Sequence, residues 1–339
     1  MRSMLLKYCV REFESRLPHM GNSFQRRIGY TGDIEHISRA VCDAYNLGTF
    51  KENDIITTGY EDFNISLRTT RGKYLIKIFS DFRDVDNCKR YVDVMSKVMD
   101  SKISIPRLLK LGDDYFHVTD IDGSKIRLCV MNFIEGRDFY MPERAPNEEE
   151  IKYIAKQAAM INSIMIKPTH IYDTWAVVNF SREFKSKNKY LQKDDLKLIA
   201  PVLADWRKLG IEKMPHCFVH GDMIKTNLIE DMKRKIWILD FAVSNYYPRI
   251  VEMAVLACNV LFNKDDKRKS ERNLNTALKE YQKTIILSEK ELAALPTCVK
   301  AAHAMHILIS SYERKAKKNT TKENEYWFDQ GRSGLLQML

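Results

Sequence analysis

The chain has 339 residues, of which 45% are hydrophobic, a content sufficient for a packed core. No apolar run approaches the roughly 20 residues that a membrane span requires. Lys7 also interrupts the first apolar residues too early for a secretory signal. We therefore expect a cytoplasmic protein with no membrane partner. The cysteines lack C-x-x-C spacing, which argues against a disulfide framework or a zinc site; they are residues 9, 42, 88, 129, 217, 258 and 298.

The net charge of +10 raises the question of a nucleic-acid partner. The lysines and arginines are spread along the chain, and the denser clusters at 264–272 and 314–318 are mixed with acidic or polar residues. Such clusters are typical of solvated loops and helix ends. We therefore expect no nucleic-acid partner, and a general electrostatic attraction for acidic ligands instead.

Residues 1–30 form an extension without a clear pattern, and apolar spacing predicts a helix over residues 33–45. Residues 59–79 alternate apolar and polar side chains on both sides of Arg71-Gly72, which predicts a β-hairpin. Lys77 lies between two isoleucines on the second strand of this hairpin. A lysine on a central strand requires an anion nearby.

The next segment, residues 84–99, has the apolar spacing of a helix and carries Asp86 and Asp93 as acids. Residues 108–134 return to strand patterns and include a buried-looking run that ends at Glu135-Gly136. These segments together predict a β-rich N-terminal part.

From Asn147 onward the chain is mainly helical by its apolar spacing. Ser288 and Glu291 have the spacing of a capping box and predict a helix start. His303 and His306 share one face of the helical run that follows, but no carboxylate stands at ligand spacing from them. We interpret both as satisfied or surface histidines and not as metal ligands.

The most informative segment is His220-Gly221-Asp222-Met223-Ile224-Lys225-Thr226-Asn227, followed by an apolar strand that ends in Asp240-Phe241. An H-x-D-x-x-x-x-N loop and a D-F pair carry the catalytic base and the metal ligands of phosphotransferases. By this pattern Asp222 is the base, Asn227 and Asp240 bind Mg²⁺, and His220 belongs to the catalytic set. Residues 231–234 fit a hairpin turn that brings the two segments together.

The stretch from Phe218 to Leu256 resembles the aminoglycoside phosphotransferase, choline kinase and homoserine kinase superfamily. Members phosphorylate small-molecule hydroxyls on a protein-kinase-like fold, and usually continue with Gly-Pro-x-x-x-Asp-Leu-Ala. Here Tyr247 stands where Gly is usual, and Glu252 stands where Asp is usual. Both residues can still serve as a turn and as a buried carboxylate that braces the catalytic loop.

The segment from Gly59 to Asn64 resembles the G-x-[ED]-[ND]-x-N opening of the homoserine kinase and hydroxylysine kinase branch. The resemblance implies that Gly59 and Asn64 belong to a loop that covers the nucleotide, and that Lys77 binds its phosphates. Either Asp86 or Asp93 would be the acid that pairs with Lys77. The strand that ends near Asn132 and Ile134 would be the hinge, whose backbone groups meet the adenine edge.

The resemblance implies an α+β, two-lobed fold with a nucleotide-binding lobe over residues 31–134 and a helical lobe over residues 135–339. The expected activity is transfer of the γ-phosphate of ATP, with Mg²⁺, to a small-molecule hydroxyl acceptor. A protein kinase is an alternative, but no A-P-E-like segment follows Asp240, and an apolar helix begins within a dozen residues. An inactive pseudokinase is a second alternative. Retention of Lys77 together with Asp222, Asn227 and Asp240 argues against it.

The acceptor itself carries no motif, and neither the preference for ATP over GTP nor the oligomeric state follows from the sequence. An amino alcohol, a hydroxy amino acid, a sugar and an aminoglycoside all remain open, although a basic protein fits a polycationic aminoglycoside less well. Candidate acceptor residues by chemistry alone, each also compatible with a structural role, are Trp175, Tyr190, Asp194, Asp195, Tyr246, Trp327 and Asp329.

Overall fold

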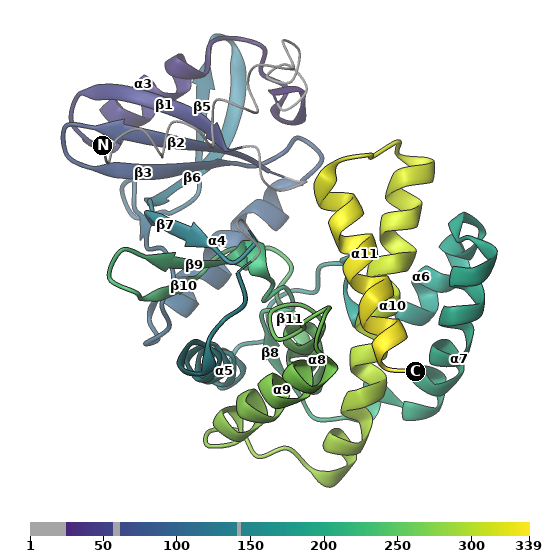
Figure 1. Cartoon of the computed structure of the whole chain (residues 1–339). Coiled ribbons are helices and arrows are strands. Elements are labelled where there is room, and N and C mark those ends of the chain that lie inside the picture. The colour runs from purple at the N-terminus through teal and green to yellow at the C-terminus, as the bar shows by residue number, and fades with distance from the viewer. Residues whose placement is uncertain (1–24, 57–61, 141–143) are drawn as a thin grey trace, which may run out of the picture. The chain divides into compact units, whose positions relative to one another are not determined.

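The computed structural model describes residues 25–56, 62–140 and 144–339. The chain divides into two compact units (Figure 1). The N-terminal unit comprises residues 1–96 and 106–133, and the C-terminal unit comprises 97–105 and 134–339. From the sequence we place the division after residue 134.

The N-terminal unit is built on an antiparallel sheet with the strand order β1-β2-β3-β6-β4, in which β5 pairs with β6. Among the described residues of this unit, two helices accompany the sheet. The elements are α3 (Ile34–Ala44), β1 (Phe50–Ile56), β2 (Phe63–Thr69), β3 (Lys73–Ile78), α4 (Val85–Met99), β4 (Leu108–Leu109), β5 (His117–Ile121) and β6 (Ser124–Asn132), after a short 3-10 turn at Arg26–Ile28.

Alternating apolar residues explain this sheet. In β2 and β3, Ile65, Leu67, Ile76 and Ile78 are fully buried and belong to one core cluster with residues of α3. The expected hairpin is present, with Asn64 opposite Lys77 in the register of β2 and β3. Helix α3 begins at Asp33, whose side chain accepts the backbone N–H of Glu35 and so caps the helix.

The C-terminal unit is mainly helical and carries two small sheets. β10, β9 and β7 form one sheet in that order, and β8 pairs with β11. The strands are β7 (Gly136–Asp138), β8 (His216–Val219), β9 (Leu228–Asp231), β10 (Ile236–Ile238) and β11 (Asn245–Pro248). The helices are α5 (Glu148–Asn162), α6 (Phe180–Lys187), α7 (Lys193–Leu209), α8 (Ile250–Cys258), α9 (Lys267–Tyr281), α10 (Glu289–Ala316) and α11 (Lys322–Gln337), with short 3-10 turns at Val177–Asn179, Asn188–Tyr190, Ile211–Lys213 and Lys225–Asn227.

Helix α10 forms much of the core of the C-terminal unit. It starts at the expected capping box, because the Ser288 and Glu291 side chains each bind the other residue's backbone N–H. α11 lies beside α10 (Figure 1), and a Cβ atom at Gly334 would come within 1.9 Å of the His303 ring. In the described part of the chain, α10 is the one helix long and apolar enough to cross a membrane, and 67% of its qualifying window is buried inside the protein.

These features confirm the predicted fold class, a small antiparallel N-terminal sheet followed by a larger helical part. The six cysteines within the described residues carry free thiols, and five of them are buried. Cys9 lies outside the described residues. His303 is also buried, with 1% of its surface exposed, and His306 is partly buried.

Candidate active site

The catalytic loop connects β8 to β9. Gly221 has φ +79°, a left-handed conformation that a residue without a side chain adopts at no steric cost. The loop then forms a 3-10 turn at Lys225–Asn227 that leads directly into β9. The sequence His-Gly-Asp thus turns sharply after β8 and places Asp222 at the start of the loop.

Asp222 and Asn227 contact each other directly. The side-chain amide of Asn227 donates to Oδ2 of Asp222 at 2.7 Å and to the backbone oxygen of Asp222 at 3.0 Å. The amide nitrogen of Asn227 therefore orients the carboxylate, and its carbonyl oxygen is the side-chain atom suited to a cation.

Asp240 follows β10 and adopts φ +58°, which is uncommon for a residue other than glycine. The backbone N–H of Leu239 donates to the backbone oxygen of Asn227 at 2.9 Å. Asp240 is therefore one residue away from a direct bond to the catalytic loop. The structure brings together Asp222, Asn227 and Asp240, as the motif spacing predicts.

The buried side chain of His220 connects the catalytic loop to the residue before Asp240. The ring is fully buried; Nδ1 accepts the backbone N–H of Asp222 at 3.1 Å, so Nε2 carries the proton and donates to the Leu239 oxygen at 2.9 Å. Burial lowers the pKa of His220 to about 4. His220 is thus a neutral side chain that holds the backbone of Asp222 and Leu239 in place.

A second buried group braces the loop from α8. The carboxylate of Glu252 is 0% exposed and accepts the backbone N–H of His220 at 2.6 Å and that of Gly221 at 3.3 Å. Burial raises the pKa of Glu252 to about 7, although these hydrogen bonds favour the ionised form. Glu252 is thus a buried carboxylate that braces the catalytic loop, as we expected from the sequence.

Lys77 is buried in the N-terminal unit, with 4% of its surface exposed. Its ammonium lies 3.1 Å from Oδ2 of Asp62, and the other oxygen of that carboxylate accepts Nε of Arg83 at 2.9 Å. Asp86 and Asp93 are both exposed residues of α4. Asp62, just before β2 in the segment from Gly59 to Asn64, thus forms the ion pair with Lys77 that we expected from Asp86 or Asp93.

Asn64 lies beside Lys77 because the two residues are directly opposite in the β2 and β3 pairing. Side chains at such positions share one face of a sheet. Oδ1 of Asn64 is buried and has no hydrogen-bond partner among the described residues. An unsatisfied buried oxygen beside an ammonium fits a site completed by a ligand.

The remaining nucleotide candidates have different outcomes. Gly59 lies outside the described residues. The backbone N–H of Asn132 donates to the Arg107 oxygen at 3.1 Å, and Oδ1 of Asn132 accepts the Arg107 N–H at 2.5 Å. The backbone N–H and the side-chain oxygen of Asn132 therefore both form hydrogen bonds within the N-terminal unit. Ile134 is the first residue of the longer segment of the C-terminal unit, residues 134–339.

The donor set of the C-terminal unit fits a hard divalent cation. Asn227 offers an amide oxygen and Asp240 a carboxylate, and Mg²⁺ typically takes one or two protein oxygens together with phosphate oxygens and water. The described residues contain no group of three or more His, Cys, Asp or Glu side chains suited to a metal. A metal held here would therefore depend on oxygen atoms from a nucleotide for the rest of its coordination.

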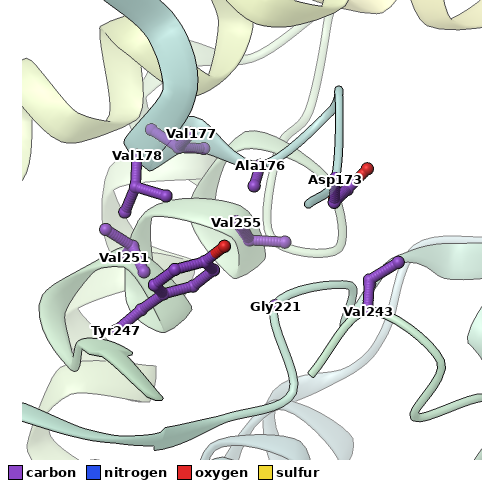
Figure 2. A pocket seen from close by; sticks show the side chains of 9 residues that line it. All are labelled: Asp173, Ala176, Val177, Val178, Gly221, Val243, Tyr247, Val251 and Val255. Carbon is purple, nitrogen blue, oxygen red and sulfur yellow. The ribbon is translucent and has the colours of Figure 1, made fainter. Parts of the chain in front are cut away.

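A pocket opens beside the catalytic loop within the C-terminal unit (Figure 2). Gly221, adjacent to Asp222, and Val243, three residues after Asp240, border it. Tyr247 from β11 forms another side, and its hydroxyl points toward the space between Val255 and Gly221 in Figure 2. The other lining residues are Asp173, Ala176, Val177, Val178 and Val251.

The candidate acceptor residues do not line this pocket. Asp195 is buried and paired with Arg332 at 3.1 Å, Tyr190 packs on Tyr312, and Tyr246 stacks on His216. Trp175 and Trp327 both contact the ring of His306. Asp194 and Asp329 are exposed. We selected Tyr246 from the sequence, but Tyr247 lines the pocket. Neighbouring residues of a strand face opposite sides, so only one of the two tyrosines can point into the pocket.

Residues 55–284, well over half of the chain, match the phosphotransferase enzyme family. The chain belongs to this family. The match spans β2 to α9 and includes the candidate nucleotide, metal and catalytic residues from Gly59 to Asp240. This confirms the predicted superfamily and the enzyme class: the protein is a phosphotransferase that acts as a small-molecule kinase.

Individual relatives of this phosphotransferase are distant. It is 21% identical to a homoserine kinase of Sinorhizobium fredii (strain NBRC 101917 / NGR234) over 284 residues, which cover 84% of this chain and 86% of the relative. A structure of an amicoumacin kinase in complex with AMP-PNP, Ca²⁺ and Ami superimposes with a TM-score of 0.67 at 15% identity, covering 93% of this chain and 96% of that one. A microcompartment-associated aminopropanol kinase gives 0.60 at 12% identity, covering 89% and 95%.

Proposed function

We propose that this phosphotransferase moves the γ-phosphate of ATP to the hydroxyl of a small amino alcohol or hydroxy amino acid. The observation that carries the proposal is the pair of contacts made by Asn227. Its side chain donates to the Asp222 carboxylate, and its backbone oxygen accepts the N–H of Leu239, the residue before Asp240. The named acceptors of the distant relatives, homoserine and aminopropanol, support this acceptor class.

In the proposed reaction, Asp222 takes the proton of the acceptor's hydroxyl group. The oxygen of that hydroxyl forms a bond to the γ-phosphorus as the bond from the γ-phosphorus to the leaving ADP oxygen breaks. The products are ADP and a phosphate ester, and the proton remains on Asp222 until water takes it. Asn227 orients the Asp222 carboxylate for this step. His220 and Glu252 position the loop without touching the reacting atoms.

The nucleotide and the metal are assigned to separate residues. Lys77 binds the phosphates, the backbone at Ile134 faces the adenine edge, and Gly59 and Asn64 belong to the covering loop. Asn227 and Asp240 hold Mg²⁺, which when bound neutralises charge on the β- and γ-phosphate oxygens.

An acceptor panel tests the proposed function. The full-length protein is supplied with ATP, Mg²⁺ and a pool of amino alcohols, hydroxy amino acids, sugars and aminoglycosides, and phosphate transfer is followed alongside ATP hydrolysis without acceptor. We expect at least one amino alcohol or hydroxy amino acid to be phosphorylated far faster than ATP is hydrolysed. A parallel reaction contains protein substrates in place of the small molecules. Labelling of protein alone would indicate a protein kinase, and ATP binding without any transfer would indicate a pseudokinase.

A further inference from the structure

Asn162, the last residue of α5, is a polar side chain inside the C-terminal unit, with 4% of its surface exposed. Its amide nitrogen donates to the backbone oxygen of Phe218 in β8 at 2.9 Å and to Oε2 of Glu252 at 3.4 Å. A buried amide is costly unless its hydrogen bonds are satisfied. Asn162 meets this need by connecting α5 to β8 and to the carboxylate that braces the catalytic loop.

Tyr281, the last residue of α9, fixes the orientation of this amide. Its fully buried hydroxyl donates to Oδ1 of Asn162 at 2.7 Å. The backbone oxygen of Phe218 can only accept a hydrogen bond, so the Asn162 atom that faces it is the nitrogen, and the oxygen faces the tyrosine. Burial raises the pKa of Tyr281, which therefore keeps its proton and remains a donor.

The contacts of the Glu252 carboxylate suit its ionised form. Oε2 accepts the backbone N–H of His220 at 2.6 Å and the amide of Asn162, and Oε1 accepts the backbone N–H of Gly221 at 3.3 Å. Hydrogen bonds from N–H groups favour a carboxylate over a protonated carboxyl. His220 and Gly221 are the two residues before Asp222, so a protonated Glu252 would hold the start of the catalytic loop less firmly.

Other titratable or charged side chains adjoin this network, namely Cys217, His220, Arg249, Tyr281 and Glu291. Burial raises the pKa of the cysteine and of the tyrosine, and lowers that of the histidine to about 4, so these three are neutral near pH 7. The arginine and Glu291 form a salt bridge at 2.7 Å. Glu252, whose pKa burial raises to about 7, is therefore the member of this group that titrates near neutral pH.

We propose that Asn162, oriented by Tyr281, is a positioning residue for the catalytic loop: it keeps Glu252 in the ionised form that binds the loop amides and so holds Asp222 in place. The inference rests on the proposed function, in which Asp222 is the base. It deepens that function by adding two residues that touch no reactant and a dependence of the loop on protonation.

The variant Asn162→Leu removes the amide, and phosphate transfer by the full-length protein is then followed between about pH 5 and about pH 9. In the parent, kcat should fall on the acid side of the Glu252 pKa, about 7. In Asn162→Leu the fall should begin about one pH unit higher, because the carboxylate has lost an N–H donor. A shift of that size lowers kcat at pH 7 by about fivefold, with the KM values of ATP and acceptor unchanged and kcat restored at high pH.

The variant Tyr281→Phe removes one hydroxyl and keeps the ring, so it decides the matter if Asn162→Leu does not fold. It should move the acid limb of kcat in the same direction by a smaller amount. Because the hydroxyl acts through Asn162, the double variant should match Asn162→Leu and not the sum of the two. Asn273→Leu is the control: the Asn273 amide, partly buried in α9, donates to the backbone oxygen of Leu261 at 3.0 Å and not to Glu252.

Hydrogen–deuterium exchange of the peptide over residues 218–224 reports on the loop without turnover. At pH 7 this peptide should exchange faster in Asn162→Leu and in Tyr281→Phe than in the parent and in Asn273→Leu.

Robust phosphate transfer with the same pH profile and the same loop exchange in the parent and both variants would overturn the positioning role and leave the proposed function standing. A loss of kcat in Asn162→Leu that is uniform across pH would show a structural role only, and would overturn it as well. Faster loop exchange in both variants, with no acceptor phosphorylated by the parent, would support the positioning of the loop and overturn the proposed function.

Discussion

Asp222 is the side chain on which the proposed proton transfer depends. Asp222→Asn keeps an oxygen that can accept the Asn227 amide, so the loop should keep its shape while the base is lost. We expect turnover to fall by about two to four orders of magnitude, with ATP affinity nearly unchanged. Asp194→Asn, an exposed aspartate of α7, is the control. Turnover within a few-fold of the parent would remove Asp222 from the mechanism.

Asp240 is assigned to the metal, and its removal should change how the nucleotide responds to Mg²⁺. We expect ATP to bind the parent more tightly with Mg²⁺ than without it, and to bind Asp240→Ala equally in both conditions. Calorimetric titrations of ATP with and without Mg²⁺ measure this difference. If Mg²⁺ strengthens binding equally in both proteins, Asp240 is not a ligand.

Lys77 shares Asp62 with Arg83, so the acid keeps a partner when the lysine is replaced. Lys77→Met should therefore leave the N-terminal unit folded. Loss of one charged hydrogen bond to phosphate should weaken ATP binding by about ten- to a hundredfold. The exposed Lys110 provides the control variant Lys110→Met. Unaltered ATP affinity in Lys77→Met would contradict the phosphate role.

At the scale of elements, α8 supports the catalytic loop through Glu252. The folded-state pKa of about 7 lies above the ordinary value of 4.5, so between these values the folded protein holds a proton that the unfolded chain has released. Relative to Glu252→Gln, the free energy of unfolding of the parent should fall as pH rises from about 4.5 to about 7, by at most about 1.4 kcal/mol per pH unit.

Denaturant unfolding of both proteins across this pH range gives the difference directly, and other titrating groups cancel in it. A difference that is constant with pH would mean that Glu252 does not titrate in this window. Glu252→Asp is a useful third variant, since it keeps the carboxylate but shortens its reach to the His220 and Gly221 amides.

The part of the candidate site that lies in one continuous segment of the chain could be predicted from the sequence. The catalytic loop, the hairpin of β9 and β10 and the following aspartate are contiguous, and their spacing determines their geometry. Asp62 was missed because its approach to Lys77 depends on the register of β2 and β3, and the acid was sought on α4 instead. The pocket was missed for a similar reason: its lining comes from separate segments between Asp173 and Val255, which no local spacing relates.

Across the C-terminal unit, three histidines with lowered pKa values make the fold sensitive to acid. Burial lowers the pKa of His220 and His306 to about 4 and that of His303 to about 3. These rings stay neutral in the folded protein while the unfolded chain protonates them. The free energy of unfolding should therefore decrease as pH falls from about 6.5 toward 4, by at most about 1.4 kcal/mol per pH unit for each ring.

Replacing one of the three histidines tests how many protons the unfolded chain takes up. His306→Gln should make the decrease shallower by about one proton, as measured by denaturant unfolding at several pH values. His36→Gln is the control, because His36 is exposed and its pKa is raised beside Asp122, so it does not titrate in the same window. Equal slopes in the parent and His306→Gln would mean that His306 binds its proton as readily in the folded protein as in the unfolded chain.

The catalytic loop also depends on a residue synthesised long after it. The ammonium of Lys225, three residues after Asp222, donates to the Tyr326 hydroxyl of α11 at 2.9 Å across 101 positions of the chain. Ribosomes add about 5–20 residues per second, so a nascent chain carries the whole loop for about 5–20 seconds before Tyr326 exists. During that interval the emerging protein holds a complete set of catalytic side chains without this contact, and the loop reaches its final state only after α11 has been made.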